Sequence, residues 1–295
     1  MNVMPTLIRR EYQEHRALWL APLVTALLLV GTAVFGHFEM ATMKALTIDQ
    51  ARAILGITVW AMSLVIFIVA ATVISFYLLD CLYSERRDRS ILFWKSLPVS
   101  DAATVLSKFL VALVVTPIGV FLFAVATDLV VRGILTARAG AGLIADEFPL
   151  WDTGTWFKSQ ALLGIWLCAS ILWYAPLAAW MLLVSAWARR NVMMWAVLPP
   201  LVLALIERFV LHTSYVWNFI SDRLAPAFPA LKGMETQLAT QTVTISREKV
   251  VSLPRLFDSL DISSVFFNAP MLLGLVAAVA LLYVTVRLRR YRDDG

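Results

Sequence analysis

Six long apolar stretches constrain this 295-residue chain more than any other feature of its sequence. A helix needs about 20 predominantly apolar residues to cross a bilayer, because it rises about 1.5 Å per residue across a hydrocarbon core roughly 30 Å thick. The stretches that meet this requirement are residues 17–36, 54–83, 104–131, 157–187, 192–211 and 265–286. The sequence therefore predicts an all-α polytopic membrane protein with about six transmembrane helices, forming one transmembrane domain over residues 1–295.

The composition excludes a water-soluble protein. Apolar residues make up 60% of the chain and charged residues 15%, with a mean hydropathy of +0.78, whereas about a quarter of the residues of a soluble domain are charged. The formal net charge of +5 does not indicate a nucleic-acid partner, because Lys and Arg occur in short clusters between the apolar stretches rather than along one polar face. Cys81 and Cys168 lie in or beside apolar stretches, so no disulfide framework is expected.

The distribution of basic residues predicts the orientation, since short loops rich in Lys and Arg stay in the cytoplasm. The richer side carries Arg9, Arg10, Arg16, Arg86, Arg87, Arg89, Lys95, Lys108, Arg189, Arg190, Arg287, Arg289, Arg290 and Arg292. The two shorter loops of the other side carry Lys44, Arg52, Arg132, Arg138 and Lys158. We therefore expect both termini inside and the long loop 212–264 outside, although that loop also contains basic residues. The first stretch is longer than the core of a secretory signal, which favours an uncleaved anchor.

The connection between the second and third stretches, residues 84–100, joins the densest charge cluster of the chain to four bulky apolar residues. The charged residues are Glu85, Arg86, Arg87, Asp88, Arg89 and Lys95, and the apolar residues are Ile91, Leu92, Phe93 and Trp94. We predict a short amphipathic helix from Glu85 to Lys95, ended by Leu97-Pro98, with Ser100 or Asp101 capping the third span. Such a helix suits a groove on a cytoplasmic partner; the alternative is a helix that lies on the lipid headgroups.

The same segment resembles the coupling loop of ABC-2-type permeases. The family pattern is matched by Glu85-Arg86, Ser90, Ser96 to Ser100 and Ser107-Lys108, and the sequence departs from it at Arg89, where many relatives have glycine. The resemblance implies the membrane subunit of a bacterial type-2 ABC exporter, multi-pass in the plasma (inner) membrane. It also implies a separate cytoplasmic ATPase subunit that binds ATP and Mg, and pairing of the chain with a second copy or a related permease.

We expect the ATPase subunit to dock on the charged and aromatic residues of this loop. Arginines supply electrostatic contacts and aromatic residues supply buried anchors, in line with the composition of binding hot spots. The candidate docking residues are Glu85, Arg86, Arg87, Asp88, Arg89, Phe93, Trp94 and Lys95.

Residues 1–16 are expected to form an interfacial helix that leads into the first span. Its apolar face carries Ile8, Tyr12, His15 and Trp19, and its charged residues Arg9, Arg10, Glu11, Glu14 and Arg16 are expected largely elsewhere. This arrangement is similar to the elbow helix of the same family.

Four tryptophans recur every seven residues in the fourth stretch. They are Trp166, Trp173, Trp180 and Trp187. Because seven residues on a helix return to nearly the same direction, the indoles form one stripe. The stripe has two interpretations, a path for an amphipathic or aromatic substrate and a seam between helices.

Ionisable residues are almost absent from the centres of the stretches, which argues against an ion-coupled carrier. Asp128 and Arg132, near the outer end of the third stretch, are expected to form a local ion pair. Glu207 and Arg208, near the outer end of the fifth, are expected to reach the membrane interface.

The sequence offers no catalytic or metal-binding constellation. No G-x-x-x-x-G-K-[ST] phosphate loop is present, so ATP hydrolysis is expected on another polypeptide and the chain itself is not expected to be an enzyme or to bind a cofactor. His15, His37 and His212 are scattered, without the spacing of metal ligands. Two rival functions remain: an ATP-independent carrier or channel, and a membrane enzyme or assembly factor, which predicts polar residues converging at one depth.

Overall fold

The computed structural model describes residues 3–36, 48–88, 99–140, 153–224 and 266–291. Within these ranges every regular element is helical, and six stretches are long and apolar enough to cross a membrane. They are Ala17–Phe35, Thr58–Arg87, Asp101–Leu135, Trp156–Trp187, Val192–Leu211 and Ala269–Tyr291. The all-α fold and the six predicted spans are confirmed, with boundaries close to the predicted ones.

The spans are built from α-helices and two short π-helical turns, η1 and η2. In chain order the described elements are α1 (Val3–Glu14), α2 (Ala17–Phe35), α4 (Ile48–Arg87), α6 (Asp101–Leu110), η1 (Val111–Val115), α7 (Thr116–Gly140), α8 (Thr153–Trp187), α9 (Val192–Ile206), η2 (Glu207–Leu211), α10 (Tyr215–Leu224) and α14 (Ala269–Tyr291). The third span therefore consists of α6, η1 and α7, and the fifth of α9 and η2.

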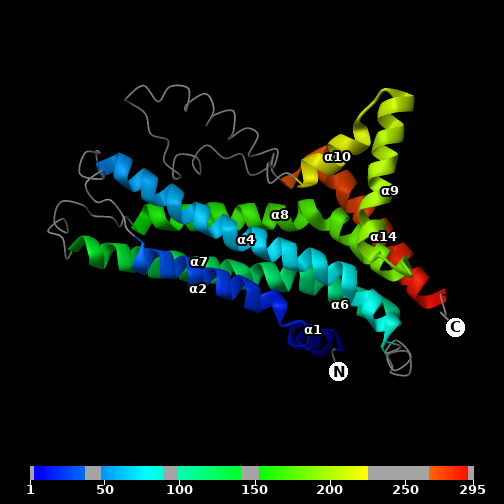
Figure 1. Cartoon of the computed structure of the whole chain (residues 1–295), viewed down its shortest axis with the longest axis horizontal. Coiled ribbons are helices and arrows are strands. Elements are labelled where there is room, and N and C mark those ends of the chain that lie inside the picture. The colour runs from blue at the N-terminus through cyan, green and yellow to red at the C-terminus, as the bar shows by residue number, and fades with distance from the viewer. Residues whose placement is uncertain (1–2, 37–47, 89–98, 141–152, 225–265, 292–295) are drawn as a thin grey trace.

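Helices α2, α4, α7 and α8 run alongside one another, and α14 packs along α8 (Figure 1). Helix α9 points away from this bundle. The short helix α1, the end of α4, the start of α6 and the end of α14 all lie at one end of the bundle, which we call the terminal end because the N- and C-termini are there. Residues far apart in the sequence therefore meet at this end.

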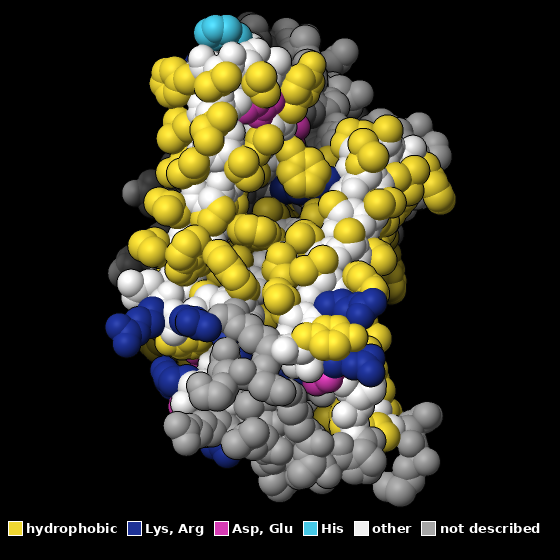
Figure 2. Space-filling model, turned by 90° about the vertical axis from the view of Figure 1, so that its right-hand side faces the viewer, with side chains coloured by type: hydrophobic (Ala, Val, Ile, Leu, Met, Phe, Trp, Pro, Cys, Tyr) yellow, Lys and Arg dark blue, Asp and Glu magenta, His cyan; other side chains and the backbone are white. Residues whose placement is uncertain are grey.

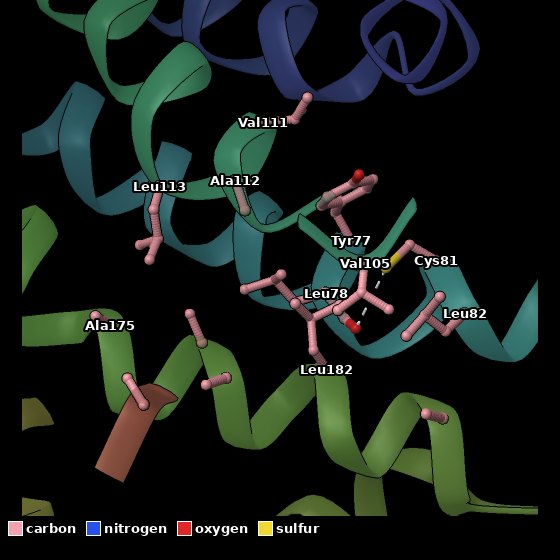
Figure 3. Close-up of a cluster of buried hydrophobic side chains, with 14 of the residues drawn as sticks. Tyr77, Leu78, Cys81, Leu82, Val105, Val111, Ala112, Leu113, Ala175 and Leu182 are labelled. Carbon is pink, nitrogen blue, oxygen red and sulfur yellow. Dashed lines mark hydrogen bonds between the residues drawn. The ribbon is translucent and has the colours of Figure 1, made fainter. Parts of the chain in front are cut away.

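A hydrophobic cluster lies between α4, α8 and the first half of the third span (Figure 3). Helix α8 contributes small residues such as Ala175 and Ala179, which let neighbouring helix backbones approach closely. Against them pack Tyr77 and Leu78 from α4 and residues of α6 and η1 such as Val105. This cluster fixes the relative positions of the helix ends that carry the charged residues described below.

The predicted amphipathic helix 85–95 is wrong at its start. Helix α4 continues without a break to Arg87, so Glu85, Arg86 and Arg87 form its last turn. These residues are good helix formers, and basic residues are favourable at a helix C-terminus because they complement the helix dipole. Residues 89–98 lie outside the described ranges. The predicted cap of the third span is confirmed: Ser100 is the N-cap of α6, and its hydroxyl accepts a hydrogen bond from the Ala103 amide at 3.1 Å.

The predicted loop 212–264 begins with a helix that the sequence analysis did not foresee. This helix, α10, contacts α8 and α9. The rest of the loop, residues 225–264, lies outside the described residues. The side of the membrane that the loop occupies stays a prediction.

Candidate functional site

A row of alternating charges crosses the terminal end of the bundle. Lys108 Nζ lies 2.7 Å from Glu11 Oε1 and 3.0 Å from Glu85 Oε1. Arg289 Nη1 lies 2.7 Å from Glu85 Oε2, and Arg289 Nε lies 3.1 Å from Asp101 Oδ1. These five residues, which we call the ion network, come from α1, α4, α6 and α14.

Four of the five residues of the ion network are buried, and the fifth, Asp101, is partly exposed. Lys108 is 1% exposed, Glu11 2% and Arg289 6%, and Glu85 is buried to a similar extent. A buried charge is strongly unfavourable unless it is paired and hydrogen-bonded. The network meets this condition, because each of its two cations lies between two carboxylates. Tyr77, part of the hydrophobic cluster, donates a further hydrogen bond from its hydroxyl to Glu11 Oε2 at 2.9 Å.

The ion network holds both flanks of the segment 84–100, which we call the coupling segment. Glu85 lies at its beginning, and Asp101 follows directly after its end. Arg289 of α14 pairs with both carboxylates. One guanidinium therefore joins the two flanks, and Lys108 links Glu85 to Glu11 of α1.

Residues 24–139, which run from α2 to the end of α7, match the family model described as ABC-2 family transporter protein. This part of the chain, which we call the ABC-2 region, is similar to the membrane proteins of ABC-2 family transporters. It contains the coupling segment and three members of the ion network. No curated protein and no solved structure matches the chain significantly. With the six apolar helices, the match supports a multi-pass transmembrane permease of an ABC transporter.

Two of the candidate docking residues of the ABC-2 region face the protein interior rather than a partner. Glu85 belongs to the ion network, and Arg86 Nη2 donates hydrogen bonds to the carbonyls of Ser185 and Ala188, at 2.7 Å each. Arg86 therefore caps the C-terminal turn of α8, a position where a cation is favourable. The expectation of surface docking by Glu85 and Arg86 is corrected, because their side chains bind helices of their own chain.

The other candidate docking residues remain predictions. The side chains of Arg87 and Asp88 are each 61% exposed and pair with one another at 3.1 Å. The remaining candidates, Arg89, Phe93, Trp94 and Lys95, lie outside the described residues.

Glu11 lies on a buried face of α1, contrary to the prediction. It was expected away from the contacting face, but its carboxylate is buried beneath Lys108 and Tyr77. The available signal was the spacing of Leu7 and Glu11, which places both residues on one side of a helix, and both are buried. An acidic residue four positions after a buried apolar residue, as Glu11 is after Leu7, lies on the same buried side of the helix and needs a hydrogen-bonding or cationic partner there.

His15, which follows directly after α1, also contacts the network region. Its ring packs edge-to-face on Tyr77 with centroids 4.7 Å apart, and its Nε2 lies 3.8 Å from Glu11 Oε2. Burial lowers the pKa of His15 from its ordinary value; the nearby Glu11 carboxylate opposes this shift and Lys108 adds to it.

The four tryptophans of the stripe pack against neighbouring helices. Trp173 Nε1 donates to the Asp222 carbonyl and Trp180 Nε1 to the Ala196 carbonyl, each at 2.9 Å. Trp166 meets Phe67 of α4, with ring centroids 5.3 Å apart, and Trp187 meets Trp195 of α9, with centroids 4.7 Å apart. These contacts favour a helix seam over a substrate path.

The predicted ion pair of the third span is confirmed and belongs to a larger cluster. Arg132 Nε donates to Asp128 Oδ1 at 2.6 Å. Trp156 Nε1 and Gln160 Nε2 of α8 donate to Asp128 Oδ2 at 2.6 and 2.5 Å. The buried Asp128 therefore joins α7 to α8 as well as pairing along its own helix.

Glu207, expected at the membrane interface, is buried and binds a neighbouring helix of its own chain. Its carboxylate accepts hydrogen bonds from the amides of Tyr215 and Val216 at 2.6 Å and from the Thr213 hydroxyl at 2.8 Å. These are the first amides of α10, which have no partner within the helix. Glu207 thus caps α10, whereas its neighbour Arg208 is exposed.

Arg223 of α10 is 1% exposed, although a basic residue in a long loop is ordinarily expected in solvent. Its guanidinium donates to the carbonyls of Trp173 and Pro270, at 2.7 Å each, and lies over the rings of Trp173 and Phe219. Burial lowers the pKa of Arg223. The space for the guanidinium comes from Gly274 of α14, where a Cβ would lie 2.6 Å from Arg223 Cζ. Arg223 therefore holds α10 against α8 and α14.

Within the described ranges, no group of three or more His, Cys, Asp or Glu side chains is arranged to hold a metal ion. The ion network joins the ends of α1, α4, α6 and α14 beside the coupling segment.

Proposed function

We propose that the chain is the membrane-spanning subunit of an ATP-driven ABC exporter, which works with a separate cytoplasmic ATPase subunit in the bacterial plasma (inner) membrane. The observation that carries this proposal is the pairing of Arg289 with Glu85 and Asp101, on the two flanks of the coupling segment. A loop tied at both flanks to α4, α6 and α14 transmits a push to these helices instead of absorbing it. That property suits a contact with a motor, and the match of residues 24–139 to ABC-2 transporters supports the same function.

In the proposed cycle, closure of two ATPase subunits displaces the coupling segment. The displacement shifts the last turn of α4 through Glu85 and the start of α6 through Asp101. Arg289 carries it to α14, and Lys108 carries it to Glu11 of α1. Packed interfaces favour discrete arrangements over continuous deformation. We therefore expect the helices joined by the ion network to adopt two arrangements, one with the substrate path open to each side of the membrane.

In this proposal the ATPase subunit contacts the coupling segment. Arg87, Asp88 and Arg89 supply charged contacts, and Phe93 and Trp94 supply the buried anchors, as aromatic and arginine residues do at other interfaces. The ATPase subunit, not this chain, binds ATP and Mg.

A second copy of the chain, or a related permease, packs against α9. Only 11% of the most apolar 18 residues of the fifth span are buried inside the described chain, compared with 56% for the fourth span. Exposed apolar side chains such as Val197, Leu203 and Ile206 extend along α9. Figure 2 shows a face of the molecule on which apolar side chains cover most of the surface and the Lys and Arg side chains gather mostly toward one end.

The ATPase partner is tested by purifying the tagged chain from native membranes and identifying soluble ATPases that come with it. We expect the wild type to retain an ATPase and Trp94→Ala to lose it. Trp217→Ala is the matched control, because Trp217 is an exposed tryptophan of α10, which is not part of the terminal end. Retention of the ATPase and of its transport-coupled hydrolysis by Trp94→Ala contradicts the proposed docking.

The role of the ion network is tested by comparing Arg289→Gln with Arg290→Gln in the reconstituted complex. Both variants lose one positive charge at the end of α14, but Arg289 is buried and paired whereas Arg290 is exposed. We expect Arg289→Gln to keep the ATPase bound and to lower transport-coupled hydrolysis about fivefold or more, the scale of an ordinary coupling free energy. Equal hydrolysis in the two variants contradicts transmission through the network.

An ATP-independent carrier or channel predicts transport by the purified chain without nucleotide. The same reconstituted vesicles, prepared without the ATPase subunit, distinguish that function from the one proposed.

A further inference from the structure

A groove of about 630 Å³ lies between α1 and the third span. On α1, Met4, Ile8 and Tyr12 form one row at i, i+4 spacing, and Pro5, Arg9 and Gln13 form the next row. Val115, at the end of η1, closes the other side. The groove has the size of ordinary small-molecule sites, and its walls are mainly apolar.

Three polar side chains line this groove without a protein partner. Within the part of the chain that the structure describes, Arg9, Tyr12 and Gln13 make no hydrogen bond or ion pair through their side chains, although they lie on a helix whose other charged residues are paired. Arg10 pairs with Glu14 at 2.7 Å, and Glu11 belongs to the ion network. The groove therefore offers one cation and two neutral hydrogen-bonding groups to a ligand.

The hydroxyl of Tyr12 lies inside the groove rather than in bulk solvent. Its oxygen is 3.7 Å from the position that a Cβ would take on Gly119 of α7, one turn beyond Val115. Burial raises the pKa of Tyr12, so the hydroxyl keeps its proton and acts as a hydrogen-bond donor at neutral pH.

The position of the groove beside the start of the first span suits the region where headgroups meet hydrocarbon. Helix α1 leads directly into α2, which begins at Ala17, and the opposite wall belongs to the third span. A basic side chain at this depth attracts anionic lipids, with a stabilisation of about 1 kcal/mol for each Lys or Arg near the surface.

We propose that this groove binds an anionic phospholipid of the leaflet on which α1 lies. Arg9 and Gln13, both exposed at the mouth, bind the phosphate. Tyr12 donates a hydrogen bond to a phosphate or ester oxygen, and Ile8 and Val115 contact an acyl chain. The neighbouring face of α1 carries Glu11, so the lipid also fixes α1 against the ion network. This site is independent of nucleotide and of the proposed export function.

The test uses the full chain reconstituted in vesicles of equal parts phosphatidylglycerol and phosphatidylcholine. After mild detergent extraction, native mass spectrometry counts the lipids retained by each chain. We expect the wild type to retain phosphatidylglycerol in preference to phosphatidylcholine, and Arg9→Gln to lose several-fold of this retention. Tyr12→Phe loses about twofold to tenfold, the effect of one hydrogen bond.

Arg10→Gln is the matched control, because it removes the same charge from the neighbouring position of α1, where Arg10 pairs with Glu14 instead of lining the groove. It is expected to retain lipid as the wild type does. Val115→Phe leaves the charges intact and fills the groove, so it is expected to reduce retention as well.

Equal losses in Arg9→Gln and Arg10→Gln overturn the proposal, because they indicate diffuse attraction to the charge of α1. Equal retention of the two lipids by the wild type, or undiminished retention by a folded Val115→Phe, overturns it too. Circular dichroism establishes that each variant is folded.

Discussion

At the scale of single residues, Lys108 holds the key position of the ion network. Its ammonium pairs with both Glu11 and Glu85, and it is almost fully buried. Removing one partner of a buried ion pair is more damaging than removing both, because it leaves an uncompensated charge in a low dielectric.

We expect Lys108→Met to lower the free energy of unfolding by about 3–5 kcal/mol, because Glu11 and Glu85 then lose their shared cation. The midpoint of thermal unfolding in detergent measures the effect. The double variant Glu11→Gln with Lys108→Met is expected to recover part of the loss. Arg10→Gln, which breaks an exposed pair, is expected to cost less than about 1 kcal/mol. A Lys108→Met midpoint close to that of Arg10→Gln contradicts the energetic role of the network.

Gly274→Ala is expected to destabilise the contact of α10 with α14. The new Cβ would displace the Arg223 guanidinium from the carbonyls of Trp173 and Pro270, leaving buried polar groups unpaired at a cost of about 1–3 kcal/mol. Thermal unfolding measures the change. Gly133→Ala is the control, since a Cβ there meets nothing within 4 Å and alanine favours a helix. If Gly274→Ala also lowers the unfolding midpoint strongly in a protein that already carries Arg223→Leu, displacement of Arg223 is not the cause of the destabilisation.

His15 makes the stability of the terminal end dependent on pH. Its folded-state pKa is lowered, mainly by burial, so between pH 6.5 and the folded pKa the unfolded chain binds the proton more readily than the folded one. The stability from neutral His15 is therefore present above about pH 6.5 and is lost as the pH falls through the folded pKa. We expect the unfolding midpoint to fall more steeply on acidification in the wild type than in His15→Gln. Parallel profiles exclude His15 as the cause.

At the scale of elements, side chains from other helices complete the helix ends. Arg86 binds the last carbonyls of α8, and Glu207 binds the first amides of α10, while Ser100 caps α6 locally. The turn between α8 and α9, residues 188–191, directs α9 away from the bundle. In that turn Asn191 has a positive φ of 52°, a conformation that Asn tolerates better than most residues.

We expect Arg86→Met to loosen the end of α8, because the carbonyls of Ser185 and Ala188 lose a charged donor worth about 1.5–3 kcal/mol. Hydrogen exchange of the last turn of α8, followed by mass spectrometry, measures this local opening. Arg87→Met is the matched control, because Arg87 is exposed and pairs with its neighbour Asp88. Equal exchange in the two variants would contradict the capping role of Arg86.

At the scale of the whole molecule, α9 is an apolar helix that the described part of the chain leaves mostly uncovered. If a second copy packs there, single cysteines on α9 will crosslink between chains. We expect crosslinking of Val197→Cys in native membranes and none of Leu28→Cys on α2, which is equally exposed and apolar. Both variants require a Cys168→Ser background, because Cys168 is exposed. Crosslinking of neither or of both equally would argue against α9 as the specific contact.

The sequence alone determined the six spans and the all-α fold, because membrane insertion depends on the hydrophobicity of consecutive residues. It also determined local contacts, such as the Ser100 cap and the Asp128–Arg132 pair, whose partners lie three or four residues apart. The resemblance to ABC-2 permeases is confirmed by the match to residues 24–139. It could be recognised from the sequence because the residues of the motif lie close together along the chain.

Only the tertiary structure decided which charges meet at the terminal end. Glu11 and Lys108 are 97 residues apart, and Glu85 and Arg289 are 204 apart, so their pairing depends on which faces the packed helices turn toward one another. The same holds for Arg223, whose place depends on the missing side chain of Gly274 in another helix. Hydropathy specifies that a helix lies in the membrane, but the rotation and neighbours of that helix are set by packing. That packing turned Glu85 and Arg86 from expected surface contacts into interior ones.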